Sequence, residues 1–262
     1  MGLSAEERER YSRQIMLPEV GEDGQEQLKA ARVLVAGAGG LGSPVLMYLA
    51  AAGVGTLGIA DFDSVDLSNL QRQVIHDSER IGVSKAESAR ETISKINPKT
   101  RVMLHKEKIT AKNIGAVIKD YDFVVDCVDN FAAKFLINDA CVIYKKPFCH
   151  GGVREFTGQM MTYVPGECAC CRCLFEDIPP EGEYPESAAL GIFGSVPGII
   201  GSMQALEAQK YIIGAKGLLA GRMLVFDGLK PQVRIINVPK NPGCRVCGEN
   251  ADIKALEDKN YS

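Results

Sequence analysis

The sequence has little excess charge and no long uninterrupted apolar run. Its 30 Lys and Arg against 33 Asp and Glu give a formal net charge of −3. Without a basic surplus, nucleic acids and anionic membranes are unfavoured partners. The longest apolar stretch, 44–60, is interrupted by Gly53, Gly55 and Gly58. It predicts a helix followed by a strand, and no membrane span.

Histidine is also scarce, and the N-terminus lacks an apolar signal sequence. The chain is charged from its fifth residue, so we expect a cytoplasmic protein. In that compartment the nine cysteines indicate metal binding or reactive thiols more than disulfides. The histidines form no triad with a nucleophile in the sequence, and each is predicted to be structural: His76, His105 and His150.

The 262 residues, 46% of them apolar, suffice for one large α/β domain or two small ones. Strands are predicted at 32–36, 56–60, 101–108, 122–127, 159–164, 222–226 and 232–238, and helices at 4–16, 41–52, 84–97, 131–144 and 196–213. The spacings Ser4-x-x-Glu7 and Ser84-x-x-Glu87 predict capping boxes that open two of these helices. Strand and helix alternate in the first half, which predicts a parallel sheet with right-handed crossovers. The second half looks more antiparallel. With no flexible linker visible, we expect one continuous sheet.

A glycine-rich turn follows the first predicted strand. Gly37, Gly39 and Gly42 fill a G-x-G-x-x-G frame, and Asp61 follows about 20 residues later. Glycines let the backbone approach a phosphate, and the acid can bind ribose hydroxyls. The pattern therefore predicts a Rossmann-like nucleotide site, although a tight turn without a ligand would have the same sequence pattern. It does not say which nucleotide binds.

Cationic and polar residues follow the ribose acid. Asn69, Arg72 and Lys85 suit a triphosphate, whose charge must be neutralised as its α-phosphorus is attacked. Asp126 and Asp129 lie at the carboxyl end of the strand predicted at 122–127, and a carboxylate there could hold Mg²⁺. The alternative is a set of surface ion pairs and turn residues, which explains any one of these positions but explains the whole set poorly.

Two CxxC pairs stand about 70 residues apart, Cys170/Cys173 and Cys244/Cys247. Four thiolates in two such pairs suit a structural Zn²⁺, with an iron–sulfur cluster or two unrelated pairs as alternatives. Cys168 and Cys171 could be spare ligands or reactive thiols. The other three cysteines lie in apolar surroundings and are predicted to belong to the core: Cys127, Cys141 and Cys149.

Several motifs together carry a resemblance that spans nearly everything from Arg10 to Gly248. They stand in the order "RYSRQIMLPEVGEDGQEQL", "GAGGLGSPV", "DFDSVDLSNLQRQ", "VDCVDN", "GSMQALEAQK" and "NPGCRVCG". The sequence resembles the ThiF/MoeB/HesA family, relatives of ubiquitin-activating enzymes. The resemblance implies an ATP- and Mg²⁺-dependent adenylyltransferase. Its substrate would be the C-terminal Gly-Gly carboxylate of a small ubiquitin-like sulfur carrier, and its products an acyl-adenylate and pyrophosphate.

The family's site residues carry over by motif. Gly40 would approach the phosphates, Asp129 would hold the metal, and Arg13 would reach across a homodimer into the partner's ATP site. Arg72, Lys85, Asp129 and Arg13 are thus the implied catalytic residues. The implied nucleotide-binding residues are Gly39, Gly40, Asp61, Asp63, Ser68, Asn69, Leu70, Gln71, Arg72, Gln73, Lys85, Asp129 and Asn130. The family usually has the same four-cysteine zinc site.

The sequence departs from part of the family at Ser187, where some relatives carry a cysteine that links covalently to the carrier. A serine without a nearby base is a poor nucleophile. We therefore expect adenylylation without an obligatory covalent link there, with an external persulfide or thiol attacking the adenylate. Cys168 or Cys171 taking that role stays open.

The expected organisation is one domain over 1–248 and a tail over 249–262. Nucleotide binding is expected over about 30–150, and carrier and zinc binding over about 151–248. Two rival functions stay open: an NAD(P)-dependent oxidoreductase, and a non-catalytic carrier-binding scaffold. The pathway could be that of thiamin, molybdopterin, cysteine, tRNA thiolation or another sulfur-containing product.

Overall fold

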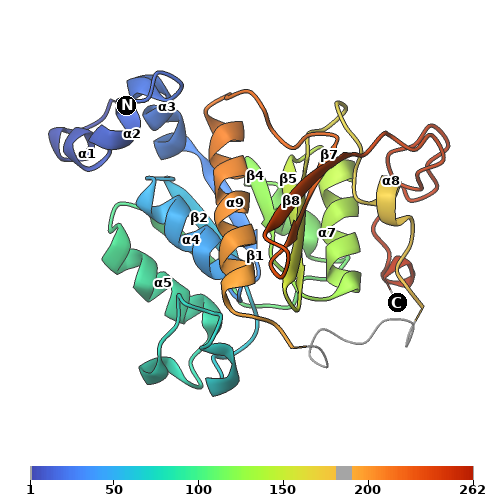
Figure 1. Cartoon of the computed structure of the whole chain (residues 1–262), viewed down its shortest axis with the longest axis horizontal. Helices are drawn as coiled ribbons and strands as arrows, with labels where there is room; N and C mark the ends of the chain where they lie inside the picture. Colours follow the sequence, from blue (N-terminus) through green and yellow to red (C-terminus); the bar gives the residue numbers. More distant parts are fainter. Residues whose placement is uncertain (1, 181–190, 262) are drawn as a thin grey trace.

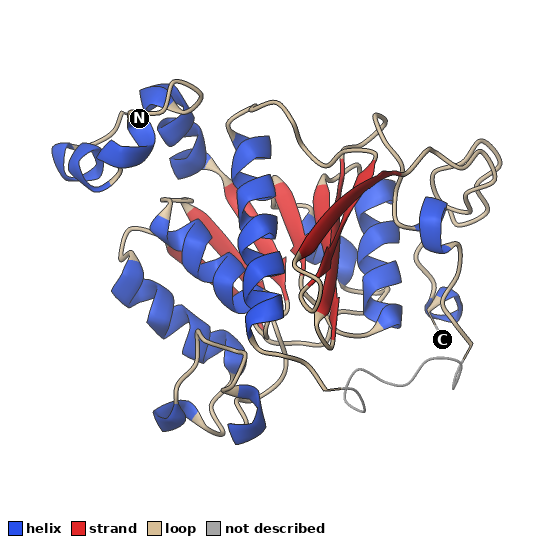
Figure 2. Cartoon of the chain, viewed as in Figure 1, coloured by secondary structure: helices blue, strands red, loops and turns tan. Residues whose placement is uncertain are grey.

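One eight-stranded sheet runs through the protein in the order β3-β2-β1-β4-β5-β6-β7-β8 (Figures 1 and 2). The structure, a computed structural model, describes residues 2–180 and 191–261. β1 to β5 pair in parallel, and β5 to β8 pair antiparallel. The strands are β1 Arg32–Ala36, β2 Thr56–Ala60, β3 Arg101–His105, β4 Phe123–Asp126, β5 Phe148–Arg154, β6 Thr157–Tyr163, β7 Arg222–Asp227 and β8 Gln232–Asn237.

Helices cover both faces of the parallel half. Successive residues of β1 serve opposite faces: Val33 and Val35 join one apolar core with α3, α4, α5 and α9, while Leu34 and Ala36 join another with α6 and α7. The helices are α1 Ala5–Arg10, α2 Ser12–Ile15, α3 Gly21–Ala30, α4 Gly42–Ala51, α5 Lys85–Ile96, α6 Ile114–Ile118, α7 Phe131–Ile143, α8 Arg172–Phe175 and α9 Ser195–Ile212. Short 3₁₀ turns are η1 Leu67–Asn69, η2 Ser78–Arg80 and η4 Asp258–Asn260.

The predicted mixed sheet, parallel in its first half and antiparallel in its second, is confirmed. The N-terminal helix is shorter than predicted: α1 and α2 are separated at Tyr11, although the capping box between Ser4 and Glu7 is present. A second predicted capping box, at Ser84, is absent because Ser84 makes no side-chain cap. The carboxylate of Glu87, which would complete that box, instead pairs with lysine and arginine side chains.

Sequence periodicity missed α3 and α6. The α3 segment, GEDGQEQLKA, is polar and holds two glycines, so its apolar stripe is weak. The C-terminal segment after Gly248 packs on the core: Ile253 is buried, and Leu256 and Tyr261 lie against the same cluster. Within the described residues, no helix is long and apolar enough to cross a membrane.

Candidate active site

The glycine-rich turn joins β1 to α4 and packs directly on neighbouring backbone. Gly37 has a φ of +96°, and a Cβ there would lie 2.8 Å from the carbonyl oxygen of Cys127. A Cβ on Gly42 would lie 1.9 Å from the carbonyl oxygen of Gly37. Neither position accepts a side chain, so the turn and the N-terminus of α4 present bare backbone, as phosphate binding requires.

Two other segments lie against this glycine turn. A Cβ on Gly40 would lie 3.6 Å from Cγ of Arg72 and 3.2 Å from the Pro197 ring in α9. A Cβ on Gly39 would lie 3.5 Å from Nε2 of Gln73. The structure therefore places Arg72 beside the glycines, as the triphosphate argument required, together with Gln73.

The segment around η1 holds Arg72 in a compact turn. Asp66 and Asn69 form a capping box around η1. The Arg72 guanidinium donates to the carbonyl oxygen of Ser68 at 3.0 Å, so one side of it is already occupied. Of the other predicted nucleotide residues here, Leu70 is half-buried and Gln71 is exposed.

Asp61, which directly follows β2, is hydrogen-bonded to the glycine turn. One carboxylate oxygen accepts the N–H of Ala38 at 2.7 Å, and the other accepts the N–H of Asp63 at 2.9 Å. Burial raises the pKa of Asp61, while these two N–H groups and Lys85 act in the opposite direction. Each carboxylate oxygen has a second lone pair for a ribose hydroxyl, so one side chain can shape the turn and bind sugar.

Lys85 is the first residue of α5 and is buried. Its ammonium lies 3.0 Å from a carboxylate oxygen of Asp63, and its backbone N–H donates to the Asp63 carbonyl. The loop after β2 thus brings Asp61, Asp63 and Lys85 together. An interior cation at the carboxyl end of the sheet suits a phosphate chain.

The two acids after β4 have different surroundings. Asp126 is fully buried: it lies 3.3 Å from the Lys134 ammonium and 2.8 Å from Nδ1 of His150, and it accepts the N–H of Val128. Burial acts to raise the pKa of Asp126, but Lys134 and His150 outweigh it and the pKa is lowered. Its oxygens are committed to the protein.

Asp129, three residues after Asp126 in the loop between β4 and α7, is exposed. Its neighbour Asn130 caps α7 by accepting the N–H of Ala133 at 2.9 Å. Asp129, and not Asp126, is therefore placed where a carboxylate can meet a metal in solution. Oxygen ligands of this kind suit Mg²⁺.

Arg13 does not join this group within one chain. It is exposed on α2, and its neighbour Gln14 donates to the carbonyl of Ala52 at the C-terminal end of α4. The glycine turn lies at the other end of this ten-residue helix, about 15 Å away at 1.5 Å per residue (Figure 1).

Four cysteines meet beside α8. The sulfurs of Cys170, Cys173, Cys244 and Cys247 all lie within 4.8 Å of one another. The 170–244 and 173–247 pairs are 3.7 and 3.4 Å apart. A tetrahedral zinc with bonds of about 2.3 Å would set sulfurs about 3.8 Å apart. The arrangement fits zinc, and the predicted pairing of the two CxxC motifs is confirmed.

Each CxxC motif also contributes an arginine. Arg172 forms a buried ion pair with Asp139 at 2.8 Å. Arg172 and Arg245 both donate to the same oxygen of Asp177, at 3.0 and 2.7 Å. The two halves of the cysteine cluster are therefore also joined by ionic bonds around Asp177, outside the sulfurs.

The two extra cysteines of this region are poor nucleophiles. Cys168 and Cys171 are buried, and burial raises the pKa of each thiol. A reactive cysteine needs the opposite environment. Cys127, Cys141 and Cys149 are buried as predicted. Ser187, the position of the covalent cysteine in some relatives, lies outside the described residues.

Sequence reasoning missed three residues that support the site. His76 joins the Ala38 carbonyl of the glycine turn, 3.0 Å away, to Ser88 of α5. Gln204 of α9 donates to the Asp126 carbonyl at 2.9 Å, and Lys134 holds the Asp126 carboxylate. His76 and Gln204 act between elements distant in sequence, whereas Lys134 lies eight residues from Asp126. Of the three, only His76 had a predicted role, a structural one.

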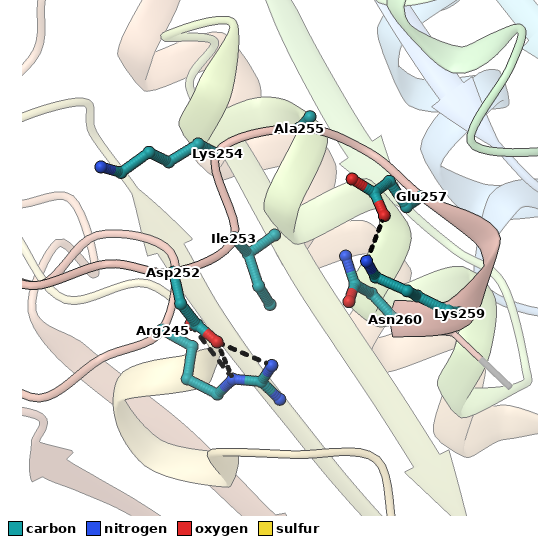
Figure 3. Close-up of a pocket in the computed structure, with 8 residues that line it drawn as sticks. All are labelled: Arg245, Asp252, Ile253, Lys254, Ala255, Glu257, Lys259 and Asn260. Atoms are coloured by element: carbon teal, nitrogen blue, oxygen red, sulfur yellow. Dashed lines mark hydrogen bonds and ion pairs between the residues drawn. The ribbon is translucent and has the colours of Figure 1, made fainter.

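A pocket of about 250 Å³ lies elsewhere, beside the C-terminal tail. Four of its charged side chains form two pairs, Arg245 with Asp252 and Lys259 with Glu257 (Figure 3). None of the residues that line it belongs to the glycine turn or to the segment around Arg72. We assign no function to it.

The fold and site define an α/β nucleotide-binding domain with cations placed for a phosphate chain. The model of the ThiF family matches residues 11–246. The chain belongs to the ThiF family, as the motifs predicted.

Curated relatives agree. The chain is 43% identical to the sulfur carrier protein adenylyltransferase of Thermus thermophilus, over 98% of this chain and 97% of that protein. It is 47% identical to the probable adenylyltransferase/sulfurtransferase MoeZ of Mycobacterium tuberculosis, over 92% of this chain. It is 42% identical to the adenylyltransferase and sulfurtransferase MOCS3 of Culex quinquefasciatus, over 98% of this chain. It spans 62% and 59% of those last two proteins.

Solved structures show the same fold at lower identity. Escherichia coli MccB with MccA-N7isoASN has a TM-score of 0.83 at 24% identity, covering 94% of this chain and 76% of MccB. PaaA has a TM-score of 0.78 at 24% identity, covering 91% of this chain and 76% of PaaA. At this identity the likeness concerns the fold alone.

Proposed function

We propose that this protein adenylylates the C-terminal Gly-Gly carboxylate of a small ubiquitin-like sulfur-carrier protein. One observation carries the proposal: Arg72 lies against Gly40 of the nucleotide turn, and Lys85 is buried at the same end of the sheet beside Asp63. Two cations around a bare glycine turn suit a triphosphate better than a dinucleotide. The 43% identity to a sulfur carrier protein adenylyltransferase along nearly the whole chain supports it.

In the proposed reaction a carrier carboxylate oxygen attacks the α-phosphorus of ATP. A new oxygen–phosphorus bond forms, and the bond from the α-phosphorus to the oxygen bridging it to the β-phosphorus breaks. Pyrophosphate leaves with that electron pair. The residues needed are those that position the two reactants and neutralise charge, and no general base is required because a carboxylate is already a nucleophile.

Each proposed role follows the geometry. Asp61 binds the ribose, the bare backbone of Gly39 and Gly40 receives the phosphates, and Arg72 and Lys85 neutralise them. Further contacts to the nucleotide come from the flanking positions Asp63, Ser68, Asn69, Leu70, Gln71, Gln73 and Asn130. Asp129 is the residue that would hold Mg²⁺, which supplies positive charge to the leaving pyrophosphate.

We further propose a zinc-bearing homodimer in the cytoplasm. Arg13 lies about one helix length from the glycine turn of its own chain, so a partner subunit would have to bring its own Arg13 to this site. Free cysteines, four of them clustered for a metal, suit a reducing compartment. With Cys168 and Cys171 buried, we favour a persulfide donor that attacks the adenylate directly.

The direct test is ATP–pyrophosphate exchange with a panel of purified carriers ending in Gly-Gly. We expect exchange with at least one of them, and none with the same carrier lacking its last glycine. A nicotinamide-dependent oxidoreductase would instead bind NAD more tightly than ATP and would exchange no pyrophosphate. A carrier-binding scaffold would bind the carrier, would show no exchange, and would be indifferent to Asp129→Ala.

A further inference from the structure

His150 on β5 has one ring nitrogen that makes no hydrogen bond within the part of the chain that the structure describes. Nδ1 lies 2.8 Å from a carboxylate oxygen of Asp126, while Nε2 is buried without a hydrogen-bond partner among the described residues. The imidazole is 5% exposed. A buried polar atom left unpaired costs about 1–3 kcal/mol. Nothing in the proposed chemistry uses this residue.

The protonation of His150 is fixed by its neighbours. Asp126 is a carboxylate already paired with Lys134, so Nδ1 carries the hydrogen and donates to it. Burial, and then Lys134, lower the pKa of His150, which keeps the ring neutral. Nε2 therefore has a free lone pair and accepts hydrogen bonds. Residues 2–180 and 191–261 thus hold an acceptor and supply no donor to it.

The neighbouring surface is bare main chain. Gly152 follows His150 by two residues and so faces the same side of the sheet, with Gln159 opposite it on β6. A Cβ on Gly152 would lie 3.8 Å from His150 Nε2, and 3.4 and 3.5 Å from Cγ and Nε2 of Gln159. Those three side-chain atoms are its nearest neighbours, so no backbone atom lies closer to this position than they do.

This patch adjoins the nucleotide site. His150 and Asp126 are register partners on β5 and β4, strands about 4.8 Å apart, and Asp129 follows three residues after Asp126. Gly152 lies about 7 Å beyond His150 along β5. A peptide whose carboxylate meets the nucleotide near Asp129 would therefore place its preceding two or three residues, at about 3.4 Å each, across this patch.

We propose that His150, Gly152 and Gln159 form a subsite for the main chain of the carrier's C-terminal glycines, in which Nε2 of His150 accepts a tail N–H. The inference rests on the proposed function. Glycine suits such a subsite because a peptide without side chains can approach the bare backbone at Gly152. The side chains around it, Gln159 and the partly exposed Phe175 whose ring centre lies 6.1 Å from that of His150, can rotate to admit it.

The test replaces the acceptor on the enzyme and the donor on the carrier. His150→Asn keeps a donor toward Asp126 and removes Nε2. His105→Asn is the control, since His105 is a half-buried histidine on β3 whose Nε2 contacts Tyr121. We expect His150→Asn to raise the carrier KM about tenfold in pyrophosphate exchange, with the ATP KM unchanged. His105→Asn should change neither KM.

A carrier with sarcosine in place of a tail glycine, made by peptide ligation, removes the N–H without touching the enzyme. For one of the two tail glycines, this replacement should raise the carrier KM of the wild-type enzyme about tenfold, and it should not raise the carrier KM of His150→Asn further. The wild-type measurement in this arm stands even where the enzyme variant folds poorly. Equal carrier KM values for wild type and His150→Asn, or additive losses at every sarcosine position, would overturn the subsite while leaving the exchange activity intact. Absence of exchange with every carrier would instead refute the proposed function.

Discussion

Lys85 provides the sharpest test of the triphosphate assignment. It is the first residue of α5, where a positive charge opposes the helix dipole, and its side chain is only 9% exposed. Its ion pair with Asp63 is about half-exposed on the acid side, and an exposed pair contributes little to stability. The fold therefore gains little from a lysine here, and Lys85→Gln should leave the melting temperature within about 2 °C of wild type.

Activity should respond quite differently. A cation about 4 Å from a phosphate charge, in surroundings with an effective dielectric constant of about 20, contributes about 4 kcal/mol. Each 1.36 kcal/mol is tenfold in rate, so the ceiling is about 1,000-fold. Arg72 and solvent will compensate in part. We expect Lys85→Gln to lower kcat/KM for ATP in pyrophosphate exchange by about 100-fold or more.

The control separates a phosphate contact from a structural ion pair. If Lys85 served only to neutralise Asp63, the double variant Asp63→Asn/Lys85→Gln would regain the exchange rate of Asp63→Asn alone, because the unpaired carboxylate is gone. A phosphate contact gives no such recovery. The reasoning is refuted if Lys85→Gln retains exchange within about threefold of wild type, or if the double variant restores it.

Three further predictions concern other parts of the molecule. Cys173→Ser should lower the zinc content, measured by elemental analysis, from about one per chain to near zero. It should also reduce the melting temperature by about 10 °C or more. A full zinc complement in the variant would contradict the proposed zinc site. Glu7, hydrogen-bonded to Ser4 and paired with Lys29, has its pKa lowered from 4.5 to about 2, so its stabilisation is complete above pH 4.5 and is lost as the pH falls toward 2. Urea unfolding should show Glu7→Gln about 1 kcal/mol less stable at pH 7 and a shrinking difference below pH 4.5; a difference independent of pH would refute this. Finally, inactive Arg13→Ala and Lys85→Gln proteins can be mixed 1:1 and allowed to exchange subunits. The mixture should regain about a quarter of the wild-type pyrophosphate exchange, because half of the dimers then hold one intact site out of two. No recovery would place Arg13 outside the partner's site.

Local signals predicted the fold well wherever a segment had one dominant pattern. The β-branched runs at 32–36 and 56–60 became β1 and β2 with the expected bounds. The glycine spacing located the nucleotide turn, and two CxxC spacings located four sulfurs that meet across more than 70 residues. In each case a few neighbouring residues restrict the local structure to one conformation or one kind of site.

Long-range support could not be predicted. His76 bridges the glycine turn and α5, and Gln204 reaches from α9 to β4. Neither residue has a local pattern, because its partners are set by how the helices pack. The Ser84 capping box is absent for a partly similar reason: the Glu87 carboxylate pairs with Lys106, from outside α5, and with Arg90 of the same helix.

β5 joins the parallel part of the sheet to the antiparallel part. Within residues 2–180 and 191–261, it is the strand that pairs in parallel on one side and antiparallel on the other. A deletion of one residue early in β5 would slip every later position by one, turning His150 to the opposite face and away from Asp126. Length in this strand is therefore constrained far more tightly than composition, and mutational scans should find deletions there intolerable where many substitutions survive.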